Sequence, residues 1–184
     1  YRWHFQEVHH DLWDYDAPNP VVLFDAEIDG RPRRGIAQVG KTGFTYILDR
    51  ETGEPLIGIE ERPVPQEPRH ATSPTQPHPI GDAVVPQEID IAPEGFELVN
   101  NGRIFTPYWE EPVVVKPQAT GGVNWPPSSY DPETHLLYVC AHDGAGAYSS
   151  NGETEFMEPT PGRRYRNGGY VSGGIRTRGI FAAV

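Results

Sequence analysis

The stretch Val8-His9-His10-Asp11-Leu12-Trp13-Asp14-Tyr15-Asp16 places three carboxylates, two imidazoles and an indole within nine residues. Surface turns favour glycine, proline, asparagine and serine, so this density of chemical groups is unusual for a simple connection. It is typical of a loop that holds a cation and takes part in acid–base chemistry. The flanking residues predict strands, with alternating YRWHFQ at 1–6 and the apolar run VVLF at 21–24.

The composition excludes some partners and limits the fold. The formal net charge of -11 argues against nucleic acid, because binding nucleic acid requires a positive surface, whereas metal cations are compatible with it. Glycine and proline each occur 20 times in 184 residues, together about 22% against an average of roughly 12%. Together with 11% aromatic residues, this predicts many short strands and turns and not a disordered chain.

The apolar runs have the length of strands, and proline or glycine interrupts most windows before two helical turns are complete. We therefore predict an all-β fold. The expected strands are 21–25, 35–39, 44–48, 54–59, 112–116, 136–141 and 175–183, with a hairpin turn at 29–30. The segment 144–168 is expected to be a polar loop. The single cysteine, Cys140, lies in an apolar strand and is expected to be buried and inert.

The segment from Pro63 to Pro79 contains six prolines in 17 residues. Such a segment is extended surface chain and not core, so we expect a crossover between sheets. A proline-rich motif that binds a partner is the alternative interpretation.

Two similar turns suggest a repeated unit. Asp49-x-x-Thr52-Gly53 and Asp131-x-x-Thr134 lie 82 residues apart, about twice a propeller blade of roughly 40–50 residues. Strands in repeated sheets with long insertions favour a β-propeller. A β-sandwich is the rival fold, but its even spacing of turns, about every 8–12 residues, is missing.

Three motifs together resemble the quinoprotein dehydrogenases that use pyrroloquinoline quinone (PQQ): HHDLWDYD at 9–16, GKTG at 40–43 followed by YILDRETG at 46–53, and GGVNW at 121–125. This family includes alcohol, polyol and membrane-type glucose dehydrogenases. The resemblance implies that residues 1–184 form about three blades of an eight-bladed β-propeller. It implies oxidation of an alcohol, polyol or sugar, with hydride passing to PQQ, electrons passing on to a cytochrome or ubiquinone, and a periplasmic location.

The resemblance also implies roles for particular residues. Asp14 would bind the metal and act as the catalytic base, since hard cations prefer carboxylate oxygens and a carboxylate can take the proton of an alcohol. Lys41 would hydrogen-bond the quinone oxygens and stabilise negative charge there. Asn124 and Trp125 would line the cofactor pocket. Asp16 would be a further metal ligand, with calcium expected and a lanthanide as the alternative, or it would have a structural role beside the metal.

Other interpretations remain open from the sequence. His9-His10-Asp11 could bind zinc or iron, but adjacent histidines on extended chain point in opposite directions, which favours a hydrogen-bonding role. Asp11 is expected to cap a turn. The alternative function is a non-catalytic propeller that binds a partner and keeps a relic site. The family's other metal ligands, its floor tryptophan and its cysteine pair cannot be assigned, so we expect the chain to be a piece of a larger propeller.

Overall fold

The structure, a computed structural model, describes residues 1–152, 161–162, 168–171 and 177–184. These residues form strands and two short 3₁₀ helices without any α-helix, which confirms the all-β prediction. None of the described helices is long and apolar enough to cross a membrane. The elements are β1 (Val22–Ile28), β2 (Arg31–Val39), β3 (Thr45–Asp49), β4 (Ile59–Pro63), η1 (Pro68–His70), β5 (Thr75–Pro79), η2 (Asn100–Gly102), β6 (Val113–Val115), β7 (Ser129–Asp131), β8 (Leu136–Asp143), β9 (Gly146–Ser149), β10 (Gly169–Val171) and β11 (Arg178–Ala183).

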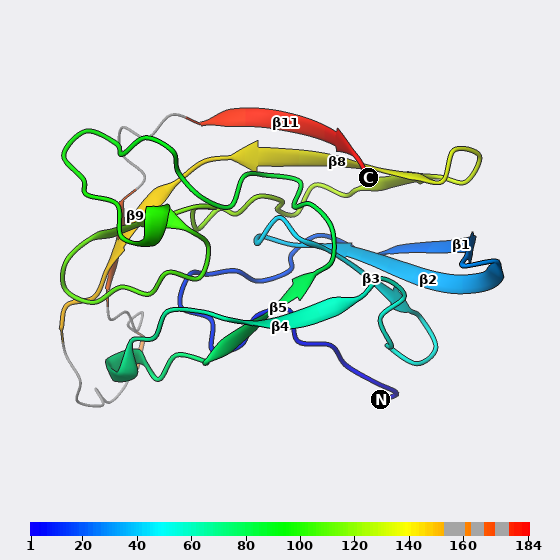
Figure 1. Ribbon diagram of the computed structural model, residues 1–184, viewed down its shortest axis with the longest axis horizontal. Helices are drawn as coiled ribbons and strands as arrows, with labels where there is room; N and C mark the ends of the chain where they lie inside the picture. Colours follow the sequence, from blue (N-terminus) through cyan, green and yellow to red (C-terminus); the bar gives the residue numbers. More distant parts are fainter. Residues whose placement is uncertain (153–160, 163–167, 172–176) are drawn as a thin grey trace.

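The described strands form separate antiparallel sheets that do not close on one another. Three sheets have three strands, in the orders β1-β2-β3, β10-β9-β6 and β11-β8-β7, and β4 pairs with β5. In Figure 1, β8 and β11 run along the top of the view, and β1 and β2 lie on the right below them. Three incomplete sheets with long connections agree with the predicted part of a β-propeller, whose blades usually have four strands.

The turn at Asp29-Gly30 forms as predicted. Ile28 pairs with Arg31 across a two-residue loop, and Asp29 and Gly30 have φ values of 54° and 70°. Positive φ at both central residues is the geometry that lets a hairpin follow the strand twist. The repeated turns also agree: Asp49 and Asp131 each accept the backbone N–H two residues on, at 2.9 Å.

Two extended segments differ from the prediction. Residues 1–6 form no strand, and there the Trp3 indole N–H donates to the Arg50 carbonyl at 3.2 Å. The proline-rich segment is not a crossover, because β4 and β5 pair with each other as a hairpin. Both strands of a two-stranded sheet are edges, so the missing N–H of Pro63 or Pro79 costs few ladder hydrogen bonds.

Strand alternation explains why the prediction for Cys140 was wrong. Leu137, Val139 and Ala141 face the core, so Cys140 between them faces outward and is exposed. The expected loop 144–168 contains a strand, β9, where it is described. The expected strand 54–59 is limited to a bridge at Pro55 and the start of β4. Residues 175–176 of the last expected strand lie outside the described residues.

An ion cluster around the buried carboxylate of Asp143 connects β8 and β11 with the residue that follows β6. Asp143, at the end of β8, has a side chain only 7% exposed. Its carboxylate lies 2.6 Å from Nζ of Lys116, just after β6, and 2.8 Å from Nε of Arg178 on β11. Burial raises the pKa of Asp143, but the hydrogen bonds and positive charges of Lys116 and Arg178 outweigh this and hold the pKa below its usual value.

We therefore expect Asp143→Asn to lower the free energy of unfolding by about 2 kcal/mol at pH 7, measured by urea denaturation. Because the folded-state pKa is depressed, the stabilisation is complete above the unfolded pKa near 4 and disappears as the pH falls through the folded value. The difference between wild type and variant should accordingly shrink below pH 4. An equal difference at pH 3 and pH 7 would contradict this role.

Candidate functional site

The three motifs meet at the backbone of Lys41. The Lys41 N–H donates to the Asp16 carbonyl at 3.3 Å, which joins the GKTG turn to the acidic loop. The Lys41 carbonyl accepts the N–H of Gly122 at 2.7 Å, which joins the same turn to the GGVNW loop. Main-chain hydrogen bonds thus join Lys41 to segments that lie 25 and 81 residues away in sequence.

The Lys41 side chain lies between two carboxylates. Its Nζ is 2.9 Å from Oδ2 of Asp14 and 2.5 Å from Oδ1 of Asp16. The lysine side chain is only 9% exposed, whereas Asp14 and Asp16 are 70% and 55% exposed. Burial lowers the pKa of Lys41, but hydrogen bonds to Asp16 and Asp14 and their charges outweigh it, so the pKa is raised and the amine stays charged.

The acidic loop is fixed by its aromatic residues, which alternate with its acids. Trp13 and Tyr15 are 1% and 2% exposed, whereas Asp14 between them and Asp16 after them are directed outward. The Trp13 indole donates to the Thr106 carbonyl at 2.8 Å, and the Tyr15 hydroxyl donates to the Pro117 carbonyl at 2.5 Å. Asp14 itself has φ 65°, a left-handed conformation that aspartate tolerates better than most residues.

Phe105 completes the aromatic support and was not predicted. The rings of Trp13 and Tyr15 stack at 5.9 Å, and Phe105 meets them edge-on at 5.5 Å and 6.0 Å. Phe105 is fully buried and also has a positive φ, of 63°. Its position some 90 residues away gives no sequence signal for this contact.

Asp11 caps the loop as predicted. Its two carboxylate oxygens accept the N–H of Trp13 at 2.9 Å and of Tyr15 at 2.7 Å. Desolvation raises the pKa of Asp11, the two hydrogen bonds lower it, and the charges of Asp14 and Asp16 raise it again, for a net increase. Three carboxylates therefore share one neighbourhood with a single ammonium, which makes the site electronegative and attractive to a cation.

The histidines of the loop have structural partners. The His9 backbone exchanges two hydrogen bonds with the buried amide of Gln76, at 2.8 Å and 2.7 Å. The His9 ring lies 3.0 Å from Glu61, and the His10 ring bonds the Ala71 carbonyl at 2.6 Å. Within the described residues, no group of three or more histidine, cysteine, aspartate or glutamate side chains could hold a metal. The hydrogen bonds of His9 and His10 favour the role predicted for these two residues.

The GGVNW loop packs directly on Lys41. Gly121 has φ 78°, and a side chain at this position would collide with the Cβ and Cγ of Lys41. The Asn124 amide is used within the loop, because Nδ2 donates to the Thr120 carbonyl and Oδ1 accepts the Trp125 N–H. The Trp125 ring is 72% exposed. Asn124 and Trp125 thus belong to a loop whose backbone, at Gly122, is hydrogen-bonded to the backbone of Lys41.

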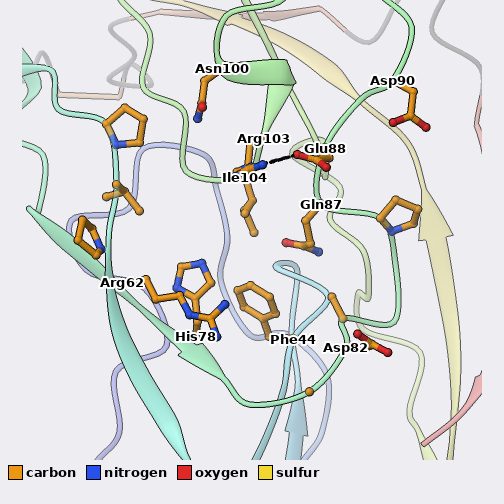
Figure 2. Close-up of a pocket in the computed structure, with 16 residues that line it drawn as sticks. Phe44, Arg62, His78, Asp82, Gln87, Glu88, Asp90, Asn100, Arg103 and Ile104 are labelled. Carbon is orange, nitrogen blue, oxygen red and sulfur yellow. Dashed lines mark hydrogen bonds and ion pairs between the residues drawn. The ribbon is translucent and has the colours of Figure 1, made fainter.

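Two cavities adjoin this region. One, of about 670 Å³, is lined by Asn124 and Trp125 together with Gln118, Thr120, Pro126, His142, Tyr170 and Thr177. The other, of about 680 Å³, contains Phe44, His78 and Gln87, and an Arg103–Glu88 ion pair lies at its edge (Figure 2). Gln87 donates to the Thr42 carbonyl at 2.9 Å, so this second cavity borders the GKTG turn. None of the predicted site residues lines it.

The open antiparallel sheets, with an acid–ammonium pair where three loops meet, define the chain as a segment of a β-propeller. The family model "Glucose/ethanol/alcohol dehydrogenase, beta-propeller domain" matches residues 1–167, so the chain belongs to this family of PQQ-dependent dehydrogenases. This confirms the family inferred from the three motifs.

Individual relatives agree. The chain is 33% identical over 155 residues to the glycerol dehydrogenase large subunit of Gluconobacter oxydans, covering 74% of this chain and 21% of the relative. It is 33% identical over 161 residues to quinohemoprotein alcohol dehydrogenase ADH-IIG of Pseudomonas putida, covering 86% and 19%. The solved structure of ADHIIG from Pseudomonas putida HK5 superposes with a TM-score of 0.59 at 26% identity, covering 97% and 22%. The chain therefore spans about a fifth of the length of these relatives.

We expect Asp11→Ala to release the acidic loop. Losing two backbone hydrogen bonds should reduce the free energy of unfolding by about 1–2 kcal/mol. Hydrogen exchange at the Trp13 and Tyr15 amides should also become faster, because both lose their acceptor. Asp131→Ala, which removes a turn cap outside the Lys41 contacts, is the matched control and should leave the exchange of these amides unchanged. Equal exchange of the two amides in both variants would show that Asp11 has no specific role.

Proposed function

We propose that this chain carries the base and the cationic group of a PQQ- and metal-dependent dehydrogenase that oxidises an alcohol, polyol or sugar. The observation that supports it is the enclosed Lys41 ammonium between Asp14 and Asp16, at 2.9 Å and 2.5 Å. An ion pair that only stabilised the fold would not need two exposed carboxylates beside one buried lysine. A binding module would need no such arrangement.

The residues fit the expected cofactor. A lysine ammonium has three N–H donors, and two of them point to Asp14 and Asp16, which leaves one to bond a quinone oxygen. The raised pKa keeps the positive charge in place at neutral pH. When bound, PQQ would supply the two-electron acceptor for the oxidation. Asn124 and Trp125, on the loop that packs on Lys41, would line the cofactor pocket.

Asp14 would act as the base. Its carboxylate is 70% exposed, so a substrate hydroxyl can reach it, while Lys41 and the buried rings of Trp13 and Tyr15 fix its position. Removing the hydroxyl proton makes the carbinol carbon a better hydride donor. Lys41 would at the same time stabilise negative charge on the quinone oxygen. A fixed ammonium in a desolvated position needs little reorganisation to do so.

Asp14 and Asp16 would provide two ligands of a hard cation, calcium in our proposal. Calcium takes six to eight oxygens, so two carboxylates form only part of its shell. The nearby charge of Asp11 adds to the electrostatic attraction without direct coordination. We also propose that electrons pass to a cytochrome or ubiquinone and that the enzyme works in the periplasm, in keeping with the family.

We expect Asp14→Asn to reduce kcat for dye-coupled oxidation by about 10²- to 10⁴-fold in the full-length protein loaded with PQQ and calcium. The amide keeps the shape of the side chain but cannot accept the proton. The control is Asp25→Asn, which alters an aspartate on β1 that pairs with Arg50. This variant should keep full activity. Full activity of Asp14→Asn would refute the assignment. If the wild-type protein does not reduce the dye with any alcohol or sugar, the non-catalytic alternative is favoured.

The metal can be tested by removal. After treatment with a chelator, calcium should restore activity fully and lanthanum should add nothing. Asp16→Ala should raise the calcium concentration needed for half-maximal recovery by about tenfold or more, because it removes one charged ligand. Restoration of activity by lanthanum but not by calcium would contradict the proposal that the metal is calcium. It would support the lanthanide alternative.

A further inference from the structure

The loop that carries Asn124 and Trp125 is held by a buried amide from outside the three motifs. Asn19 is only 4% exposed, and its Nδ2 donates to the Asn124 carbonyl at 3.2 Å and to the Pro126 carbonyl at 2.5 Å. Carbonyl oxygens accept hydrogen bonds and cannot donate them, so both contacts require the N–H donors of an amide. The two acceptors lie on either side of Trp125, so this amide fixes the backbone around the exposed tryptophan.

A second buried amide holds Asn19 in turn. Gln38 lies on β2 and is 7% exposed, and its Nε2 donates to the Asn19 carbonyl at 2.9 Å. The β1–β2 ladder ends where Val22 pairs with Ala37, so the Gln38 side chain continues the connection just beyond the last strand pair. Pro20 follows Asn19 and disfavours helical backbone at that residue. The backbone of Asn19 is therefore fixed by contacts that do not involve the loop it binds.

Two connections thus join the same three segments of the chain. The first is made by the main chain of Lys41, which bonds both the acidic loop and the GGVNW loop. The second runs from Gln38 through Asn19 to the carbonyls beside Trp125. A loop attached at one point can turn about it, whereas a second attachment restricts that rotation. The double attachment therefore fixes where Trp125 lies relative to Lys41.

We propose that Asn19 is a positioning residue for the cofactor pocket. It holds Asn124 and Trp125 in the orientation to which PQQ binds, and Gln38 acts through it. The Trp125 ring is 72% exposed, so packing contributes little to its orientation, and the hydrogen bonds of the adjacent carbonyls contribute more. A loop that is ordered before binding loses little conformational freedom when a ligand binds, which strengthens the affinity. This inference rests on the proposed function, in which Asn124 and Trp125 line the cofactor pocket.

The test uses the full-length protein, freed of PQQ and supplied with calcium. Asn19→Ala should raise the dissociation constant for PQQ, measured by absorbance titration, by about tenfold, because binding must then order the loop. Gln38→Ala should raise it by about threefold, since the amide of Asn19 remains. The matched control is Gln66→Ala, which removes an amide that donates to the Val64 and Ser73 carbonyls in the loop of the β4–β5 hairpin. This control should bind PQQ as the wild type does.

Hydrogen exchange of the protein without PQQ provides a second readout. Asn19→Ala should speed the exchange of the backbone amides in residues 120–125, whereas Gln66→Ala should not. A double-mutant cycle tests whether Asn19 acts through the loop: in a Trp125→Ala background, Asn19→Ala should weaken PQQ binding by less than about threefold. Asn19→Ser, which keeps one hydroxyl donor, should give an intermediate affinity and exchange rate, and it takes the place of Asn19→Ala if that variant does not fold.

The outcomes separate this inference from the proposed function. Absence of PQQ binding by the wild-type protein would refute the proposed function and, with it, the cofactor role of Asn19. If the wild type binds PQQ, unchanged affinity in Asn19→Ala would overturn the positioning role alone, whatever the change in hydrogen exchange. Equal losses of affinity with and without the Trp125 ring would also overturn it. Weaker PQQ binding, faster loop exchange and a kcat at saturating PQQ within about twofold of wild type together support it.

Discussion

The structure depends on the enclosure of one ammonium by two carboxylates. Lys41 is nearly inaccessible, and its charge is retained because Asp14 and Asp16 compensate the cost of burial. An unpaired buried charge would be strongly unfavourable, so the Lys41 ammonium requires the two carboxylates, which are themselves exposed. The same contacts fix the positions of two acids that remain open to solvent. The proposed site for a cation and a reacting hydroxyl is built on this pairing.

The cost of this arrangement is met by aromatic packing beneath the loop. Asp14 and Phe105 both adopt left-handed backbone conformations, which non-glycine residues rarely occupy without support. Trp13 and Tyr15 provide that support through stacking, two hydrogen bonds to carbonyls and near-complete burial. The alternation of acid and aromatic residues along the loop therefore directs the aromatic rings into the core and the carboxylates of Asp14 and Asp16 toward solvent.

Around Lys41 the chain separates charged from neutral chemistry. The acidic loop gathers the carboxylates, while the loop after Gly122 leads into a pocket whose described lining has only neutral polar and aromatic groups. Gly121 permits this close arrangement, because any larger residue would collide with the stem of Lys41.

The sequence by itself determined the all-β class and the hairpin at Asp29-Gly30, because strand periodicity and turn chemistry are local. Its dense motifs also directed attention to Asp14, Asp16 and Lys41, which the fold brings together and whose roles stay a prediction. Only the tertiary structure decided the contacts of Phe105, Asn19 and Gln38, which bring distant segments together at the site. It also turned Cys140 outward and folded the proline-rich segment into a hairpin. The physical reason is that the burial of a side chain and the pairing of a strand depend on which other strand lies beside it. A short stretch of sequence does not contain that information.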